Sequence, residues 1–249
     1  MSVRSSSASA WQERYIDRFY RSRPGWINGT IEFHNLCREV IRPGSAILEI
    51  GAGPSNPTTA FLSTLGPVRG IDLDPDVRTN AFLTGADLLE TETYPYPDRS
   101  FHACVSNYVL EHVSDPHQHF REVYRILEPG GCYLFRTPNR YHYTAIGAWL
   151  TPHAIHLKTS NRLRNLPSGS HDPYRTHYRA NSRRVLMQLS EEIGFRVEEL
   201  RLIEKEPSYG KLARPLFLLG MAYERAVNAT PAAAGLRANI LGVLRRPAA

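Results

Sequence analysis

Short apolar runs alternate with amphipathic stretches through the middle of the chain. Apolar runs bounded by turn residues predict buried strands, and apolar positions that recur every three or four residues predict helices. Strands are expected at residues 46–50, 68–72, 103–107 and 132–136. Helices are expected at residues 56–65, from Pro75 onward, and from Asp115 or Pro116 to about Leu127. Strands that alternate with helices of this length predict βαβ units, and therefore an α/β fold around a parallel sheet.

The second half of the chain departs from this alternation. Residues 138–180 are a long insertion rich in Tyr, His, Arg and Asn. After it we expect a helix at 181–193, with Asn181 or Ser182 as its N-cap and Gly194 as its end. An alternating strand at 195–202, an apolar helix at 214–227 and a last strand at 240–244 follow.

Positive charge is concentrated in the insertion. The whole chain has a net charge of +6 from 30 Lys and Arg against 24 Asp and Glu. Between Arg140 and Arg184 there are eight basic residues and a single acid, Asp172, so this segment alone carries +7. A local field of that sign favours an anionic partner, although a solvated basic loop would have the same composition.

Composition argues against several classes of protein. No run of about 20 apolar residues predicts a membrane-spanning helix. Residues 1–10 are serine-rich and lack the apolar stretch of a signal peptide, so we expect a disordered leader there. The three cysteines are far apart and form no CxxC pair, which disfavours a disulfide framework or a zinc site and favours a reducing cytoplasm.

The most informative turn joins the first strand to the following helix. Gly51 and Gly53 lack Cβ atoms, so a ligand can approach their backbone. In open α/β sheets, nucleotide-like ligands bind outside the carboxyl ends of the strands, where this turn lies. About twenty residues later, the second strand ends in Asp72, whose carboxylate can accept hydrogen bonds from both ribose hydroxyls. Asp74 and Asp76 are expected to cap the next helix instead.

The same turn discriminates between cofactors. A dinucleotide site requires a third glycine and a helix N-terminus for the pyrophosphate, but position 56 is Asn. Glu49, which lies just before the glycines, would repel a pyrophosphate and attract a cation. S-adenosylmethionine has a ribose, an α-amino group and a sulfonium but no phosphate, and it fits this combination.

The motifs together resemble those of class I S-adenosylmethionine-dependent methyltransferases, especially the bacterial quinone-biosynthesis group. ILEIGAGPS at 47–55 resembles the first family motif, and RGIDLDP at 69–75 resembles the second. YPYPDRSFHACVSNYVLEHV at 94–113 and ILEPGGCYLFRTPNR at 126–140 resemble two later segments. Two departures are Ser55 in place of the third glycine and His102 in place of an Asp. The resemblance covers under half of the chain.

This resemblance implies a fold and a cofactor site. The fold would be a Rossmann-like, seven-stranded, mostly parallel sheet with helices on both faces and an inserted acceptor-side segment. Residues 1–40 would be a leader and lid helices, and 41–249 the methyltransferase domain, with insertions at about 138–180 and 211–230. The residues implied to bind S-adenosylmethionine are Glu49, Gly51, Ala52, Gly53, Asp72, Leu73, Ser106, Asn107 and an adenine-edge acid. Spacing favours Glu90 as that acid, with Asp87 as the alternative.

The acceptor side is less defined by the sequence. His112 is the candidate general base, although a capping or packing role is favoured two to one. Tyr178 and Arg179, in an aromatic and basic tract, are candidates for binding the acceptor, or they pin the insertion to the sheet. No carboxylate or cysteine completes a metal site with the histidines, so no metal is expected.

The expected activity is methyl transfer to a small-molecule or lipid-linked acceptor, which the basic segment would allow to be anionic. O-methylation of a hydroxyl comes first and C-methylation of a quinone-like ring second. A non-catalytic binding protein on the same fold is the rival class. Nucleic acid is not expected as a partner, because no base-flipping Asn-Pro-Pro-Tyr motif follows the fourth strand. The apolar helix with Lys211 and Arg214 at its start leaves open a contact with a membrane surface.

Overall fold

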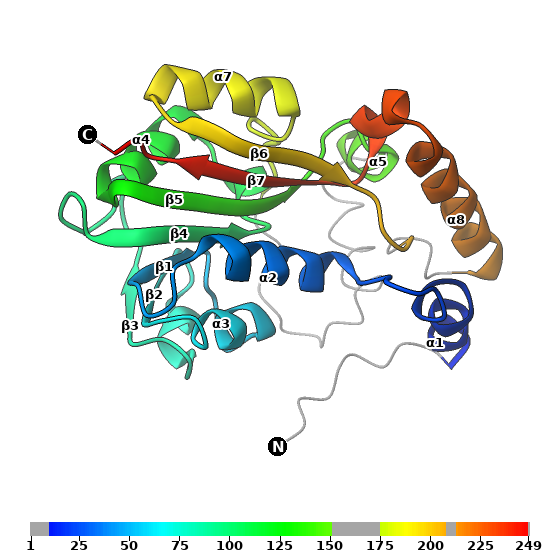
Figure 1. Cartoon of the computed structure of the whole chain (residues 1–249), viewed down its shortest axis with the longest axis horizontal. Coiled ribbons are helices and arrows are strands. Elements are labelled where there is room, and N and C mark those ends of the chain that lie inside the picture. The colour runs from blue at the N-terminus through cyan, green and yellow to red at the C-terminus, as the bar shows by residue number, and fades with distance from the viewer. Residues whose placement is uncertain (1–9, 151–174, 208–212, 249) are drawn as a thin grey trace. The chain divides into compact units, whose positions relative to one another are not determined.

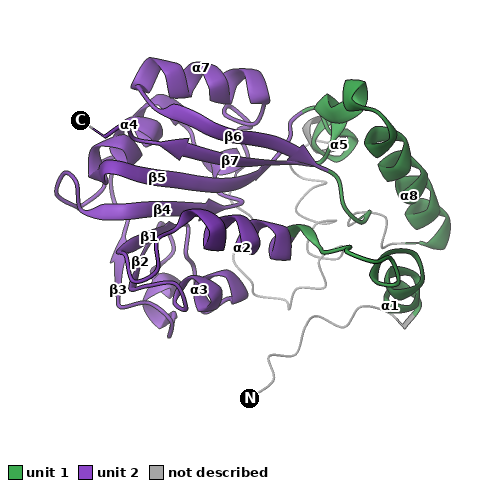
Figure 2. Cartoon of the chain, in the orientation of Figure 1, with its two compact units in different colours: residues 1–29, 141–174, 204–238 green, residues 30–140, 175–203, 239–249 purple. Residues whose placement is uncertain are grey.

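The computed structural model describes residues 10–150, 175–207 and 213–248, with side chains omitted for 147–150. The serine-rich leader up to residue 9, residues 151–174 of the insertion and Lys211 lie outside the described residues. The chain divides into two compact units, which Figure 2 shows in green and purple. Unit 1 comprises residues 1–29, 141–174 and 204–238, and unit 2 comprises 30–140, 175–203 and 239–249.

Unit 2 is built on a seven-stranded sheet with the order β3-β2-β1-β4-β5-β7-β6 (Figure 1). Only β7 runs against its neighbours, since its pairings with β5 and β6 are antiparallel and the other pairings are parallel. The expected mostly parallel, Rossmann-like sheet is therefore confirmed. The strands are β1 (Ile47–Ile50), β2 (Val68–Asp72), β3 (Gly85–Leu88), β4 (Phe101–Asn107), β5 (Leu127–Pro138), β6 (Arg196–Ile203) and β7 (Asn239–Arg245).

Helices cover both faces of this sheet because alternate strand residues are apolar on each side. On one face, Phe33 and Cys37 of α2 and Leu62 of α3 pack on the strands. On the other, Phe120 of α4 and Leu186 of α7 do so. The helices of unit 2 are α2 (Gly29–Val40), α3 (Pro57–Leu62), α4 (Pro116–Ile126) and α7 (Arg183–Ile193), with short 3-10 turns η2 (Pro75–Thr79) and η3 (Leu110–His112).

Unit 1 contains an aromatic cluster centred on Phe217, which is fully buried. The rings of Trp11, Tyr15 and Tyr20 meet it edge-on, with centroids 5.5 to 6.2 Å away. The Tyr20 hydroxyl donates to the buried carboxylate of Glu224 at 3.2 Å. The elements of unit 1 are α1 (Ala10–Ile16), the π-helical turn η1 (Asp17–Arg21), α5 (Tyr143–Leu150), α8 (Arg214–Ala229) and η5 (Pro231–Leu236). None of the described helices is long and apolar enough to cross a bilayer.

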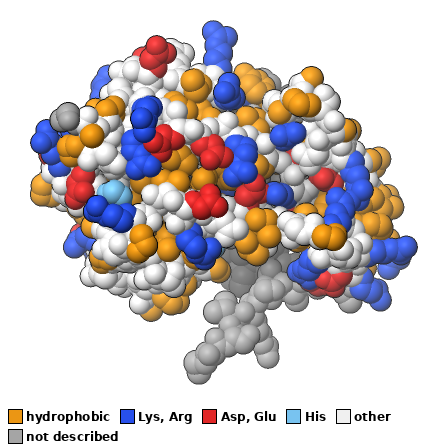
Figure 3. Space-filling model, viewed as in Figure 1, with side chains coloured by type: hydrophobic (Ala, Val, Ile, Leu, Met, Phe, Trp, Pro, Cys, Tyr) orange, Lys and Arg blue, Asp and Glu red, His pale blue; other side chains and the backbone are white. Residues whose placement is uncertain are grey.

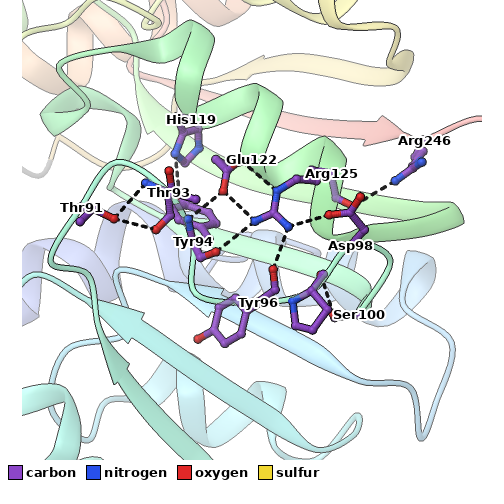
Figure 4. A network of polar contacts seen from close by, with 11 residues as sticks. Thr91, Thr93, Tyr94, Tyr96, Asp98, Ser100, His119, Glu122, Arg125 and Arg246 are labelled. Carbon is purple, nitrogen blue, oxygen red and sulfur yellow. Dashed lines mark hydrogen bonds and ion pairs between the residues drawn. The ribbon is translucent and has the colours of Figure 1, made fainter.

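One arginine fixes the loop that enters β4 (Figure 4). All three side-chain nitrogens of Arg125, on α4, donate hydrogen bonds: to both carboxylate oxygens of Glu122, to Asp98, and to the carbonyls of Tyr94 and Tyr96. Glu122 in turn accepts the Tyr94 amide at 2.8 Å. The Tyr-Pro-Tyr-Pro-Asp segment therefore has a structural role, which is to lock the loop onto α4.

Several predicted elements have different bounds in the structure. The helix expected at 56–65 ends at Leu62, and the one expected from Pro75 is a single 3-10 turn. The strand expected at 132–136 begins at Leu127, because the chain becomes extended directly after α4 and pairs from there with Phe101. Strand β3 and helix α5 were not predicted. Ser182 and Gly194 cap α7 as expected, and Gly194 is left-handed at φ +96°.

Candidate functional site

The loop between β1 and α3 begins at the carboxyl end of β1, which lies between β2 and β4 in the sheet. Gly51 and Gly53 adopt left-handed backbone angles of +71° and +54°, which glycine tolerates at little cost. The Gly51 amide donates to the Ile71 carbonyl at 2.8 Å, which joins the loop to β2. Asn56 ends the loop as the N-cap of α3, its side-chain oxygen accepting the amides of Thr58 and Thr59.

The two glycines have different surroundings. A Cβ atom on Gly51 would lie 2.3 Å from the Val109 side chain, so close packing as well as backbone angle requires glycine there. A Cβ on Gly53 would meet only the Asp72 carboxylate, at 3.9 Å. From the sequence, both glycines are expected to let a ligand approach the backbone. Packing against Val109 accounts for Gly51, whereas the space beside Gly53 is open to a ligand.

The carboxylate of Asp72, at the end of β2, hydrogen-bonds both the glycine loop and the turn that follows β2. One oxygen accepts the Gly53 amide at 2.8 Å and the other accepts the Asp74 amide at 2.9 Å. Asp74 caps the next turn by accepting the amide of Asp76, as the sequence predicted for Asp74. Each Asp72 oxygen retains a lone pair, so the carboxylate can still accept further hydrogen bonds.

Two asparagines hold the carbonyls of the glycine loop. The Asn56 amide group donates to the carbonyls of Ala52 and Pro54, and the Asn80 amide group donates to those of Gly53 and Pro54. Sequence reasoning missed both roles. Asn56 was recognisable as a helix cap, whereas nothing in the local pattern around Asn80 indicates a contact with a loop 26 residues earlier.

Glu49 is the most unusual acid in the site. It is only 3% exposed, and burial raises its pKa to about 7. The Thr59 side chain hydrogen-bonds the carboxyl group and opposes this shift, while the nearby Asp72 charge reinforces it. The Oε2 atom has no hydrogen-bond partner. A buried oxygen without a partner is costly, so this atom is suited to a ligand that brings a donor or a cation.

Polar residues near the ends of strands β4 and β5 extend the site across the sheet. The register places Asn107 of β4 beside Arg136 of β5. Arg136 is 5% exposed and donates to Asn107 at 2.8 Å and to Thr30 at 3.1 Å. The Asn107 amide group donates to Thr58 of α3 at 3.1 Å. A polar line therefore runs from β5 to the first turn of α3.

Ser106 and Tyr108 flank Asn107 differently. Ser106 lies on the opposite face of the sheet and shares a hydrogen bond with the Tyr133 hydroxyl, so only its backbone remains for a cofactor. Tyr108 has a left-handed backbone at φ +59°, which is rare for a residue other than glycine and often marks a functional site. Its ring lies under the Arg136 guanidinium at 4.5 Å, and its hydroxyl donates to Asn239.

The predicted adenine side consists of exposed and partly exposed residues. Leu73 is 59% exposed directly after Asp72. Asp87, in β3, already accepts hydrogen bonds from Arg69 at 2.7 Å and Tyr96 at 2.9 Å. Glu90 lies after the strand and is exposed. Of the two alternatives for the adenine-edge acid, Glu90 is therefore the one whose carboxylate does not already form an ion pair in the described structure.

The predicted acceptor-side residues lie in two segments, 111–114 and 175–179, that are joined by hydrogen bonds to backbone carbonyls. The Glu111 carbonyl accepts the amides of His177 and Tyr178, and the Arg179 guanidinium donates to the Ser114 carbonyl. His112 shares a hydrogen bond with the Arg175 carbonyl at 3.2 Å. These contacts support the pinning role for Arg179. Because a carbonyl only accepts, the His112 Nδ1 carries the proton, and in a neutral ring Nε2 is the basic nitrogen.

Among the described residues, no three His, Cys, Asp or Glu side chains are grouped as metal ligands. The three cysteines are buried thiols. The site that the structure presents is therefore a glycine loop, a strand-end carboxylate and a buried acid, with an Asn–Arg line beside them.

Comparisons with known proteins agree with this geometry. Residues 48–135 match the family model described as a methyltransferase domain. The ubiquinone/menaquinone biosynthesis C-methyltransferase UbiE of Hydrogenovibrio crunogenus is 28% identical over 112 residues, which cover 39% of this chain and 44% of that protein. UbiE of Vibrio cholerae is 25% identical over 174 residues, which cover 62% of this chain and 65% of that protein. The chain thus spans less than two thirds of the length of these curated relatives.

Solved structures share the fold at low sequence identity. The [4+2]-cyclase SpnF superposes with a TM-score of 0.55 at 17% identity, covering 91% of this chain and 84% of the cyclase. Geranyl diphosphate C-methyltransferase of Streptomyces coelicolor, solved with S-adenosyl-L-homocysteine, has a TM-score of 0.55 at 15% identity, covering 87% and 79%. The resemblance to class I S-adenosylmethionine-dependent methyltransferases is confirmed by the match of residues 48–135 to the methyltransferase-domain model.

Proposed function

We propose that this chain transfers a methyl group from S-adenosylmethionine to a small-molecule or lipid-linked acceptor. The observation that carries the proposal is the buried, unpartnered Oε2 of Glu49 beside a glycine loop clamped by Asp72. An acid in this position disfavours a phosphate ligand and favours a cationic one. The family match over residues 48–135 supports the same cofactor.

The protein's own groups would bind and orient rather than react with the cofactor. Bound S-adenosylmethionine supplies an electrophilic methyl group on a sulfonium. Asp72 would accept hydrogen bonds from the ribose hydroxyls, and Glu49 would face the positively charged methionine end. Gly51, Ala52 and Gly53 would form the floor, with Leu73 and Glu90 on the adenine side and Asn107 beside the methionine. Orientation of this kind contributes most of the catalysis in an in-line displacement.

For the acceptor, O-methylation of a hydroxyl is the first candidate. Removal of a hydroxyl proton of high pKa requires a base, and His112, whose Nδ1 lies 3.2 Å from the Arg175 carbonyl, is the candidate for that role. C-methylation of a quinone-like ring is the second candidate. The specific observation in its favour is that the UbiE relatives and the geranyl diphosphate enzyme are named as C-methyltransferases.

Two measurements test the proposal in sequence. Calorimetry with S-adenosylhomocysteine should show binding to the wild-type chain, and no binding would overturn the cofactor assignment. Metabolite extracts incubated with labelled S-adenosylmethionine should then acquire label only when the chain is present. Binding without transfer would favour a binding protein or another chemistry on this fold, as the [4+2]-cyclase with the same fold illustrates. The labelled product separates the candidates, because O-methylation gives a methyl ether and C-methylation gives a methylated ring carbon.

A further inference from the structure

Helix α8 exposes an apolar face. Its inner face packs Phe217 and Val227 into unit 1, together with Gly220 and Glu224. The opposite face would ordinarily carry charged residues in a helix on the surface of a globular protein. Here the exposed side chains on that face are Pro215, Leu218, Leu219, Ala222, Ala226 and Ala229, with Arg225 as the charged residue beside them. Leu219 is 67% exposed and Leu218 is 40% exposed.

Neighbouring elements of unit 1 extend this apolar surface. Tyr143 and Ile146 on α5 are 41% and 44% exposed, and Leu236 on η5 is 47% exposed. Tyr223 of α8 connects them, since its ring meets that of Tyr143 at 4.8 Å and its hydroxyl donates to the Leu236 carbonyl. Seven of the twelve large apolar side chains exposed in the described parts of the chain lie in unit 1, which holds under a third of the described residues. They therefore cluster rather than scatter.

Charge divides between the units in the same way. Unit 1 has thirteen Lys and Arg against six Asp and Glu in the sequence, a formal charge of +7. Unit 2 has seventeen against eighteen, a formal charge of −1. Two of the acids in unit 1, Glu204 and Glu224, are buried. The unit with the exposed apolar helix thus accounts for the net positive charge of the protein, and Figure 3 shows Lys and Arg side chains beside hydrophobic ones over α8.

We infer that unit 1 binds the surface of an anionic lipid bilayer, with the outer face of α8 lying in the headgroup region. Basic side chains such as Arg214 and Arg225 attract anionic headgroups, while Leu218 and Leu219 enter the boundary of the acyl chains. Exposed leucines would contribute nothing to binding a nucleic acid, whose backbone requires only the positive charge. The inference does not depend on methyl transfer, because it concerns a surface that contains none of the predicted cofactor residues.

The experiment is co-sedimentation of the full-length protein with vesicles. We expect binding to vesicles of equal parts phosphatidylglycerol and phosphatidylcholine, weak binding to phosphatidylcholine alone, and release at high salt. Leu219→Asp should weaken binding to the anionic vesicles at least about tenfold, because the leucine no longer enters the apolar region. The matched control is Met187→Asp, which makes the same change at a 39% exposed position on α7 of unit 2.

Each alternative gives a different result. Absence of binding to the anionic vesicles, or equal loss in the Leu219 and Met187 variants, overturns the inference. If the wild type sediments as a dimer that Leu219→Asp converts to a monomer, without vesicle binding, a second copy covers this face. If duplex DNA binds and vesicles do not, the charge serves a nucleic acid. Leu219→Ser, which adds no charge, shows whether a loss comes from the apolar contact, and circular dichroism confirms that each variant is folded.

Discussion

At the scale of single residues, Glu49 leads to a proton-linkage prediction. Its pKa of about 7 means that the carboxyl group is partly protonated in the free protein at neutral pH. A cationic ligand stabilises the ionised form and lowers that pKa, so binding of S-adenosylmethionine, whose sulfonium is positively charged, should release protons near pH 7. Calorimetry in two buffers of different ionisation enthalpy measures this release. Glu49→Gln should abolish it, and Glu198→Gln, on β6, should not.

The same residue affects the stability of the free protein. Because folding raises the pKa of Glu49 from 4.5 to about 7, the folded state binds more protons than the unfolded state between those values. The contribution is fully present below about pH 4.5 and is lost as the pH rises through 7, at a cost of roughly 3 kcal/mol at most. Urea unfolding should therefore show that Glu49→Gln gains stability relative to wild type between pH 5 and pH 8. If the difference in unfolding free energy between Glu49→Gln and wild type were the same at pH 5 and pH 8, Glu49 would be solvated in the folded state.

Asp72 has a structural role and a predicted binding role that one substitution can separate. Asp72→Asn keeps one side-chain acceptor for the loop but removes the charge. Cofactor affinity should fall by about 1–3 kcal/mol, since a charge-assisted pair of hydrogen bonds to the ribose is lost. Asp76→Asn, the same change in the next turn, should leave the affinity for S-adenosylhomocysteine unaltered. Equal affinities of the Asp72 variant and the wild type would place the ribose elsewhere.

The site was partly readable from sequence because its local motifs carry their own geometry. A strand that runs into glycines and an Asp at the end of the next strand indicated the crevice and the two elements that form it. The contacts made by Asn80, Thr59 and Arg136 were not readable, since each depends on how distant segments meet. Ser106 shows the limit of such reasoning, because its position at the strand end was right and the face on which its side chain lies was not determined.

At the scale of elements, capping chemistry made helix ends predictable. Ser182 and Gly194 bound α7 as expected, because their preferences arise from backbone hydrogen bonds at the helix ends. Strand β3 was missed because Gly85, Ala86 and Asp87 have low strand propensity, and pairing with β2 overrides it. At Glu128 to Gly131, inside β5, the turn that the sequence indicates is present as an irregularity, because the pairing with β4 passes from Phe101–Leu127 directly to Ala103–Cys132.

The loop that enters β4 should depend on one side chain of α4. Arg125→Met leaves the carboxylate of Glu122, which is 8% exposed, without its cation and leaves the Tyr96 carbonyl without a donor. Removing one partner of such a pair typically costs about 3–5 kcal/mol, and partial exposure of Arg125 reduces this to about 2–4. Urea unfolding measures the loss. Arg121→Met, at an exposed position of the same helix, should change stability by less than about 0.5 kcal/mol.

At the scale of the whole molecule, the sequence indicated insertions but not how they associate. From the sequence, residues 1–40, 138–180 and 211–230 are expected to be separate additions to one domain. The structure assigns most of these residues to one unit, composed of 1–29, 141–174 and 204–238. Their association rests on contacts such as those of Phe217 with Trp11 and Tyr15, which span about two hundred positions and leave no local pattern. The predicted cofactor residues all belong to unit 2.

This division makes unfolding experiments informative, because all three tryptophans, Trp11, Trp26 and Trp149, are in unit 1. Tryptophan fluorescence therefore reports unit 1, whereas far-ultraviolet circular dichroism reports the helices and strands of both units. The buried apolar cluster of unit 1 is much smaller than those of unit 2, so its transition should come at a lower urea concentration. Saturating S-adenosylhomocysteine, at about a hundred times its dissociation constant, should stabilise unit 2 by about 2.7 kcal/mol, which should raise the midpoint of the later dichroism transition and leave the fluorescence midpoint unchanged. Coincident transitions that move together on ligand binding would show instead that the two units unfold as one cooperative structure.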